Sequence, residues 1–184
     1  MNSNLAKFKS FVFYSSLAFS ILLSAFHQTS LLGKLSLSLL SLVIFTKPLA
    51  LLLPNLGLFK VLLAFRRETG QASAFFAFGH VASQTFPGVS LLGLLAFGAS
   101  SGPGSFQFWG FWALVLMVLL FLTSNDLSLR LLKRNWFYIH KLIHPLYVFV
   151  LLHYGLQKGL VGVAFALIVL FLLYGSRFLA ARGQ

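Results

Sequence analysis

The sequence has no cysteine and very few acidic residues. Without thiols the chain cannot form disulfides, iron–sulfur clusters or thiolate metal sites. Its two acidic residues, Glu68 and Asp126, stand against 14 lysines and arginines, and only 9% of all residues are charged. Soluble domains have about 25% charged residues. The scarcity of charge therefore argues against a soluble globular protein.

Long apolar runs take the place of the missing charge. Hydrophobic residues make up 59% of the 184 positions, and the mean hydropathy is +0.92. One helical crossing of a bilayer needs ~20 residues. We predict one all-α integral membrane domain over residues 1–184, with six transmembrane helices in a bundle. Their expected ranges are 9–26, 31–53, 69–87, 106–122, 136–157 and 160–179.

Two segments allow more than one interpretation. An uncleaved first helix is favoured over a signal peptide, because no small-x-small cleavage site follows its apolar core. Residues 88–105 combine a short apolar run with the loop-like stretch Ala99-Ser-Ser-Gly-Pro-Gly-Ser105. They are expected either to prolong the third helix or to lie in the membrane interface.

The basic residues predict the topology. They fall between apolar runs and not on one polar face, so we expect no nucleic-acid partner despite the net charge of +12. With six crossings, ten lysines and arginines lie on the side of the two termini, whereas Lys34 and Lys158 lie near helix ends on the other side. By the positive-inside rule both termini are expected in the cytoplasm.

Four of the five histidines fall within predicted helices. His140, His144 and His153 share the apolar stretch 134–157, and His80 lies in the third helix. A polar ring without a partner in hydrocarbon costs on the order of several kcal/mol, so each histidine needs one. Haem iron takes two axial imidazoles from facing helices, whereas zinc usually needs more protein ligands. We therefore predict haem between the third and fifth helices, with His80, His153 and His140 as metal ligands.

The residues alone leave the pairing of these histidines open. A rise of ~1.5 Å per residue places His80 about 20 Å, His140 about 9 Å and His153 about 28 Å from the predicted cytoplasmic edge. His144 precedes Pro145 and either partners His80 or bonds a backbone group that the proline frees. Histidines also join membrane helices as simple packing residues. Five aromatic side chains are expected to line the haem cleft: Phe75, Phe76, Phe78, Phe149 and Tyr147.

A set of short motifs occurs in a fixed order along the chain. Thr46-Lys-Pro-Leu49 and Arg66-Arg67-x-x-Gly70 precede His80, and Leu122-Thr-Ser-Asn-Asp126 and Trp136-x-x-x-His140-Lys-Leu precede His153. Over residues 30–157 this set resembles the ferric reductase-like transmembrane family. The spacings of 60 and 13 residues between His80, His140 and His153 are its most specific part. Within the family the resemblance is to the MsrQ (YedZ) group, the haem-binding membrane subunits of bacterial protein-methionine-sulfoxide reductase systems.

The resemblance implies a function and a set of partners. It implies b-type haem in the bacterial inner membrane and electron delivery to a periplasmic, molybdopterin-containing methionine sulfoxide reductase subunit. A cytosolic flavin reductase or membrane quinol is the implied donor, and FMN is a further candidate cofactor.

The family pattern also suggests which histidines pair. Two-haem relatives carry histidine pairs 13 residues apart on both helices, which pairs His80 with His153 at an outer haem. The position 13 residues before His80 is Arg67, so an inner haem would have His140 without a second histidine, and His144 is an alternative partner for His80. One haem is therefore expected, with two as the alternative. Three basic side chains are candidate partners of haem propionates: Arg67, Arg134 and Lys141.

These features predict an electron-transfer subunit and not a complete enzyme, and no residue is assigned a catalytic role. The glycine-rich stretch 98–104 follows no predicted strand, so it is not a dinucleotide fingerprint. Two rival functions stay open. One is the membrane subunit of a ferric or other small-acceptor reductase. The other is a haem-free transporter or assembly subunit, whose histidines would be pathway or packing residues.

Overall fold

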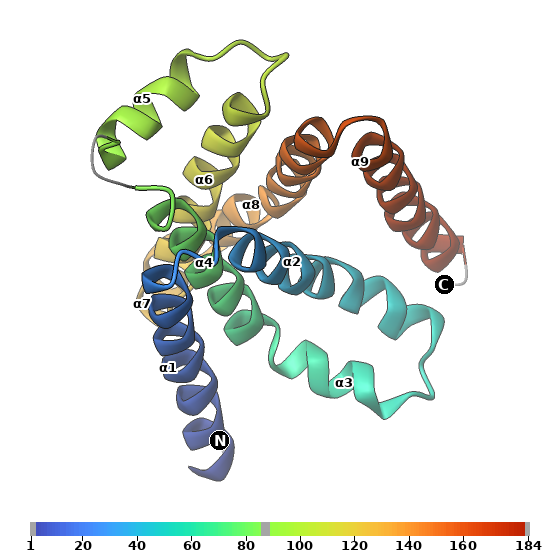
Figure 1. Ribbon diagram of the computed structural model, residues 1–184. Helices are drawn as coiled ribbons and strands as arrows, with labels where there is room; N and C mark the ends of the chain where they lie inside the picture. The colour runs from blue at the N-terminus through green and yellow to red at the C-terminus, as the bar shows by residue number, and fades with distance from the viewer. Residues whose placement is uncertain (1–2, 86–88, 183–184) are drawn as a thin grey trace.

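The computed structural model describes residues 3–85 and 89–182, and its architecture is helical (Figure 1). Nine helices occur in these two ranges: α1 (Ser3–Ala25), α2 (Thr29–Leu52), α3 (Gly57–Ala64), α4 (Arg66–Ala82), α5 (Leu91–Ser100), α6 (Phe106–Thr123), α7 (Asp126–Leu132), α8 (Arg134–His140) and α9 (Ile143–Arg182).

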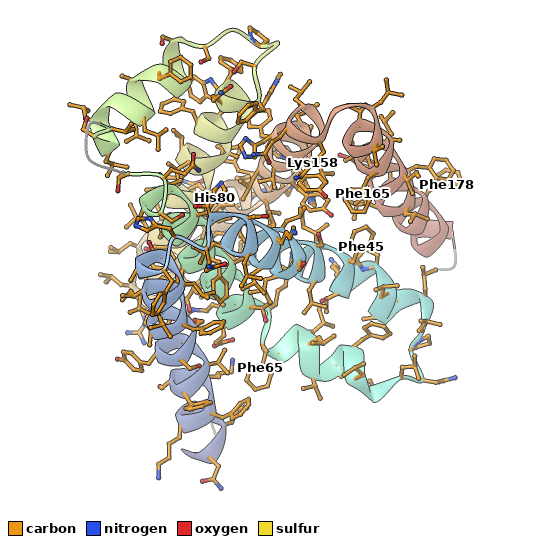
Figure 2. All side chains as sticks on the ribbon, in the orientation of Figure 1. Phe45, Phe65, His80, Lys158, Phe165 and Phe178 are labelled. Atoms are coloured by element: carbon orange, nitrogen blue, oxygen red, sulfur yellow. The ribbon has the colours of Figure 1, made fainter. Side chains whose placement is uncertain are left out.

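Four helical stretches are long and apolar enough to cross a membrane: Asn4–Ala25, Thr29–Leu52, Phe106–Thr123 and Arg134–Phe165. Large apolar side chains cover the outside of the bundle (Figure 2), and Leu160 and Phe171 are 91% and 78% exposed. Such a surface is unfavourable in water but suits contact with lipid. The chain is therefore a membrane protein, as its composition predicts.

The short helix α4 packs inside the bundle against α1, α2 and α6. Its small residues allow neighbouring backbones to approach closely. A Cβ atom on Gly79 would lie only 2.5 Å from the hydroxyl oxygen of Ser20. That hydroxyl donates to the carbonyl of Phe75 at 2.6 Å, and the Ser73 hydroxyl donates to the carbonyl of Ser36 at 2.9 Å. These bonds join α4 to α1 and α2, its neighbours in the N-terminal half.

The second half of the core lies between α6 and α9. Leu146, Tyr147 and Leu151 of α9 are almost completely buried, and they belong to one apolar cluster with residues of α6 such as Met117. The hydroxyl of Tyr147 is 2.8 Å from the Ser41 hydroxyl. This contact ties α9 to α2, so the two halves share one core.

The helix predicted over 136–157 is broken at Lys141 and Leu142, which form a turn between α8 and α9. Pro145 explains the break. A proline has no N–H to donate, and its ring collides with the carbonyl four residues earlier, which here belongs to Lys141. The amide of His144 bonds that carbonyl instead, at 3.1 Å.

The helices predicted to end at 157 and begin at 160 are two arms of α9 that meet at Gly159 (Figure 1). Gly159 has φ 65° and ψ −150°, a combination that essentially only glycine adopts. A Cβ on Gly162 would lie 2.9 Å from the carbonyl oxygen of Gly155, so the arms nearly touch beside the turn. A chain reversal at this position was predicted, and the structure has one.

Other predicted boundaries are wrong. The loop expected over 54–68 contains α3 and the start of α4, and the connector 123–135 contains α7. Residues 91–100 form the separate helix α5 and do not prolong the third helix. The helix predicted to reach Pro87 ends at Ala82, where the hydroxyls of Ser83 and Thr85 bond the carbonyls three residues earlier and compete with the helical pattern. Its predicted last residues, 86–87, lie outside the described ranges.

Polar contacts mark the two ends of the bundle. At one end Lys9 of α1 forms an ion pair with Glu68 of α4 at 3.1 Å, and Arg67 of α4 pairs with Asp126 of α7 at 2.6 Å. At the other end the hydroxyls of Thr29 and Ser83 are 2.8 Å apart. The start of α1, the start of α4 and α7 therefore share one end, as an up-and-down arrangement requires.

Candidate functional site

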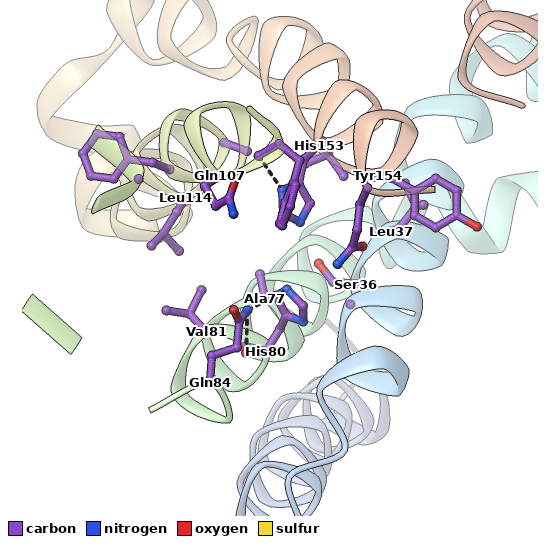
Figure 3. Close-up of a pocket in the computed structure, with 18 of the residues that line it drawn as sticks. Ser36, Leu37, Ala77, His80, Val81, Gln84, Gln107, Leu114, His153 and Tyr154 are labelled. Carbon is purple, nitrogen blue, oxygen red and sulfur yellow. Dashed lines mark hydrogen bonds between the residues drawn. The ribbon is translucent and has the colours of Figure 1, made fainter. Parts of the chain in front are cut away.

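His80 of α4 and His153 of α9 face each other near the second end of the bundle. Their ring centroids are 6.2 Å apart and their planes are nearly perpendicular, at 83°. Figure 3 shows the two rings approaching the same space from opposite walls. Of the histidines singled out in the sequence, these two are brought together.

Each of these rings is held by one backbone carbonyl. The Nδ1 atom of His80 is 2.8 Å from the oxygen of Thr29, and Nδ1 of His153 is 2.8 Å from the oxygen of Phe106. A carbonyl oxygen only accepts hydrogen bonds, so Nδ1 carries the hydrogen in both rings. In a neutral imidazole the other nitrogen, Nε2, then keeps a free lone pair, which is the form that binds a metal.

A cavity of about 370 Å³ surrounds the two rings, within the range of roughly 300–1,000 Å³ that cofactor sites occupy. Its walls are mainly apolar and come from α2, α4, α5, α6 and α9. The short helix α5 contributes Leu94, Leu95 and Gly98. Residues 91–100 thus form one wall of the cavity, a role that the sequence left undecided.

Polar side chains also contribute to the wall of the cavity, and two of them are lysines. Lys34 and Lys158 line the cavity together with Gln84 and Gln107. The amide nitrogen of Gln84 lies 3.1 Å from Nε2 of His80 (Figure 3), which is consistent with that ring nitrogen acting as an acceptor. Sequence reasoning missed all four as cavity residues. The sequence contained a signal for the two lysines, because the predicted topology assigned them, and no other lysine or arginine, to helix ends on the side opposite the two termini.

The spacing of the two rings fits a shared metal atom. Two imidazoles bound to opposite sides of one metal, through bonds of about 2 Å, have centroids about 6 Å apart. No group of three or more His, Cys, Asp or Glu side chains that could hold a metal ion occurs in the described ranges. Two facing imidazoles are the number that a metal already bound by a planar macrocycle requires.

His140 lies on α8, at the opposite end of the bundle from His80 and His153. Its ring stacks on Trp136, with centroids 3.9 Å apart and planes at 24°. Its Nε2 is 3.3 Å from the hydroxyl of Thr123, whose carbonyl accepts a bond from the Trp136 indole at 2.8 Å. The structure does not bring His140 to His80, and its role as a metal ligand stays a prediction. His144 lies in the first turn of α9, and it too is outside the cavity lining.

The three predicted propionate partners lie near the end of the bundle that carries Asp126. Arg67 donates to Asp126 at 2.6 Å and to the Ser124 carbonyl at 3.0 Å. Arg134 and Lys141 both lie over the ring of Tyr138, at 6.0 and 5.1 Å. The Arg67 guanidinium beside Asp126 holds the pKa of that exposed carboxyl below its usual value, by hydrogen bonding first and by charge second.

The predicted aromatic lining is wrong for this cavity. Phe75 and Phe76 are buried in helix packing, Tyr147 bonds Ser41, and Phe149 contacts Trp109. Among the described residues, Phe106, Phe111 and Tyr154 supply the aromatic part of the wall instead. The rotation of each helix decides which side chains face inward, and helices that are apolar all round give no sequence signal for that rotation.

Comparison with family models identifies the family of the chain. Searches of curated proteins and of solved structures each returned no significant match. The family model described as "Ferric reductase like transmembrane component" matches residues 32–151. This segment runs from the start of α2 into the first arm of α9 and includes His80 and His140, while His153 follows two residues after its end. The chain therefore belongs to the ferric reductase-like transmembrane family. Membership of this family suggests a function in electron transfer across a membrane.

Proposed function

We propose that this chain binds haem b between His80 and His153 and carries electrons across the bacterial inner membrane. One observation supports the proposal most directly. Two imidazoles face each other at 6.2 Å in a mainly apolar cavity, each with Nδ1 bonded to a carbonyl. This leaves Nε2 as the nitrogen for a metal, and at His80 a metal would replace the contact with the Gln84 amide. Membership of the family gives the reaction class.

The protein's own residues hold and isolate the group. When bound, haem supplies one-electron iron chemistry. Nδ1–H bonds to Thr29 and Phe106 orient the ligand rings and make Nε2 a stronger donor to metal. Leu94 and Leu95 of α5 and Leu114 of α6 give the cavity part of its apolar wall. Lys34 and Lys158 line the cavity and would be the residues that hold the two haem carboxylates, by charge-assisted hydrogen bonds.

The proposed topology has six crossings, formed by α1, α2, α4, α6 and the two arms of α9. Both termini lie in the cytoplasm under this proposal. The charge distribution of the sequence supports this topology. The ion pairs Lys9–Glu68 and Arg67–Asp126 support it as well, because they bring the starts of α1, α4 and α7 to one end of the bundle. The cavity then lies nearer the periplasmic surface, because Thr29 and Ser83 mark the other end.

We also propose the partners implied by the MsrQ group. The acceptor is a periplasmic, molybdopterin-containing subunit that reduces methionine sulfoxide in proteins. The donor is a cytosolic flavin reductase or membrane quinol, with FMN as a further cofactor on the donor side. His140 stacks on Trp136 near the proposed cytoplasmic end. It is the candidate ligand of a second, inner haem at which electrons would enter. These assignments rest on the ordered motifs around His80, His140 and His153.

Absorption spectroscopy of the purified protein tests the haem proposal. The full chain, expressed with added haem precursor, should be red and show a Soret band that shifts on reduction with dithionite. His80→Ala and His153→Ala should each lose that band. His27→Asn is the matched control, because His27 bonds Ser83 outside the cavity and asparagine tolerates its φ of 51°. A colourless wild-type protein would contradict the proposal and favour a haem-free transporter or assembly subunit.

Reoxidation of the reduced protein tests the acceptor. In proteoliposomes, addition of the purified periplasmic reductase with a methionine-sulfoxide protein should reoxidise the chain rapidly. Equally fast reoxidation by soluble ferric chelates alone, with no acceleration by the reductase, would favour the small-acceptor reductase function. Omission of the sulfoxide substrate provides the control, since the partner then has nowhere to pass electrons.

A further inference from the structure

The rings of His80 and His153 rest on two helices that carry no ligand. His80 lies against α2, and His153 lies against α6. In each case the carbonyl that accepts the Nδ1–H bond belongs to the first residue of the helix, Thr29 or Phe106. In each case the residue under the ring is a glycine four positions later, Gly33 or Gly110.

Positions i and i+4 of a helix lie one above the other on the same face, one turn apart. The imidazole therefore lies along a single turn, with Nδ1 at the carbonyl and the ring over the glycine. The same arrangement occurs twice, on different helices and with different ligands. Gly33 is the one glycine in α2, and Gly110 is the one glycine in α6. Since glycine is a poor helix former, its presence in a helix interior points to a packing requirement.

A methyl group at either position would collide with the ring. A Cβ on Gly110 would lie 2.6 Å from Nδ1 and 2.9 Å from Cε1 of His153. A Cβ on Gly33 would lie 3.1 and 3.3 Å from the same atoms of His80. The first contact forces the ring to move, and the second is tight enough to require a shift of a few tenths of an ångström. An added methyl group is therefore expected to disturb the histidine ring more at Gly110 than at Gly33.

We propose that Gly33 and Gly110 are positioning residues that seat the two ligand imidazoles and hold their planes crossed. This inference rests on the proposed haem ligation. Each ring is held at one edge by a carbonyl and over its surface by a helix backbone, so it cannot turn about its bond to a metal. The 83° between the planes is then a property built into four helices: α2 and α6 supply the seats, and α4 and α9 supply the rings.

Crossed imidazole planes have a spectroscopic consequence. Parallel axial imidazoles split two iron d orbitals and give a rhombic low-spin ferric EPR spectrum. Perpendicular planes leave those orbitals nearly equal in energy and give a single strongly anisotropic signal at large g. We expect the wild-type ferric protein to show the large-g signal.

Alanine variants of the full-length, haem-loaded protein in detergent test the inference. Gly110→Ala should move the signal towards the rhombic type and weaken haem affinity about 10-fold or more, the usual size for a lost support of a metal ligand. Gly33→Ala should change both readouts in the same direction but less. Gly70→Ala in α4 is the matched control, because no atom lies within 4 Å of an added Cβ there. It should leave both readouts unchanged.

The outcomes separate this inference from the function on which it rests. A wild-type protein without haem would overturn both. A haem-loaded wild type whose EPR spectrum and haem affinity are unchanged in both seat variants would overturn the inference and leave the function standing. If Gly110→Ala does not accumulate as folded protein, Gly33→Ala decides, because its milder contact leaves the helix intact. A rhombic spectrum in the wild type would also contradict the crossed planes.

Discussion

Arg67 donates to Asp126 at 2.6 Å and so ties the start of α4 to the start of α7. The pair is exposed, and the pKa of Asp126 is lowered because the arginine stabilises the ionised carboxylate. A carboxyl with a depressed folded pKa adds stability above its unfolded pKa of about 3.9. This contribution is lost as the pH falls through the folded pKa.

Asp126→Asn should therefore lower the melting temperature at neutral pH, and this effect should fade progressively as the pH drops from about 4 through the folded pKa. Thermal unfolding of both proteins in detergent, followed across this range, measures the difference. Arg67→Gln should remove the same pH dependence, and added salt should weaken it because the pair is exposed to solvent. A difference between wild type and Asp126→Asn that stays constant with pH would show that the carboxylate charge is not its cause.

Removal of His140 should leave the outer site loaded. The ring of His140 contacts Trp136 and Thr123 and does not line the cavity around His80 and His153. We expect His140→Ala to retain one haem per chain, measured by the pyridine haemochrome assay against protein concentration. A wild type with two haems should fall to one, and a wild type with one should be unchanged. Complete loss of haem from His140→Ala would place this residue in the main site.

The two cavity lysines should tune the reduction potential. A nearby positive charge favours the reduced iron, which carries one positive charge less. Lys34→Gln and Lys158→Gln should each lower the midpoint potential by about 10–40 mV, which corresponds to an exposed pair worth roughly 0.2–1 kcal/mol. Redox titration of the Soret band measures the shift. Lys60→Gln on α3 is the control, and a shift of equal size there would point to a general charge effect.

The turn in α9 should depend strictly on its glycine. Gly159 has φ 65° and ψ −150°, and a residue with a side chain in such a region costs on the order of 1–3 kcal/mol. Gly159→Ala should lower the melting temperature accordingly. Gly175→Ala, in the second arm with no atom within 4 Å of an added Cβ, should not. Equal stability of both variants would mean that the turn relaxes at no cost.

The sequence was informative about the helices where their apolar length, or a single proline or glycine, determines the local structure. Apolar length predicts the helices α1, α2 and α6, and Pro145 and Gly159 stand where α9 begins and reverses. The pairing of His80 with His153 followed from the resemblance, whereas helical rise alone left His144 open. Pro145 disturbs the helix four residues before its own position, at Lys141. The sequence prediction did not include this effect and therefore gave one continuous helix over 136–157, where the structure has a break.

The supports of the histidine rings could not be predicted in this way. Gly33 and Gly110 matter because α2 and α6 turn particular faces towards His80 and His153. That rotation depends on packing among several helices, and helices that are apolar on every side carry no periodic signal for it. The same reason explains why Phe75 and Phe76 were predicted to line the cavity but are buried between helices.

The order of the four site helices along the chain has a consequence for biosynthesis. The seat at Gly33 precedes its ligand His80, and the seat at Gly110 precedes its ligand His153. During synthesis each seat is therefore in the membrane before the ring that will rest on it. The second ligand is complete only when α9 has been inserted, so stable capture of the cofactor has to wait for that helix. Cofactor capture would then report that the bundle has been assembled as far as the cavity.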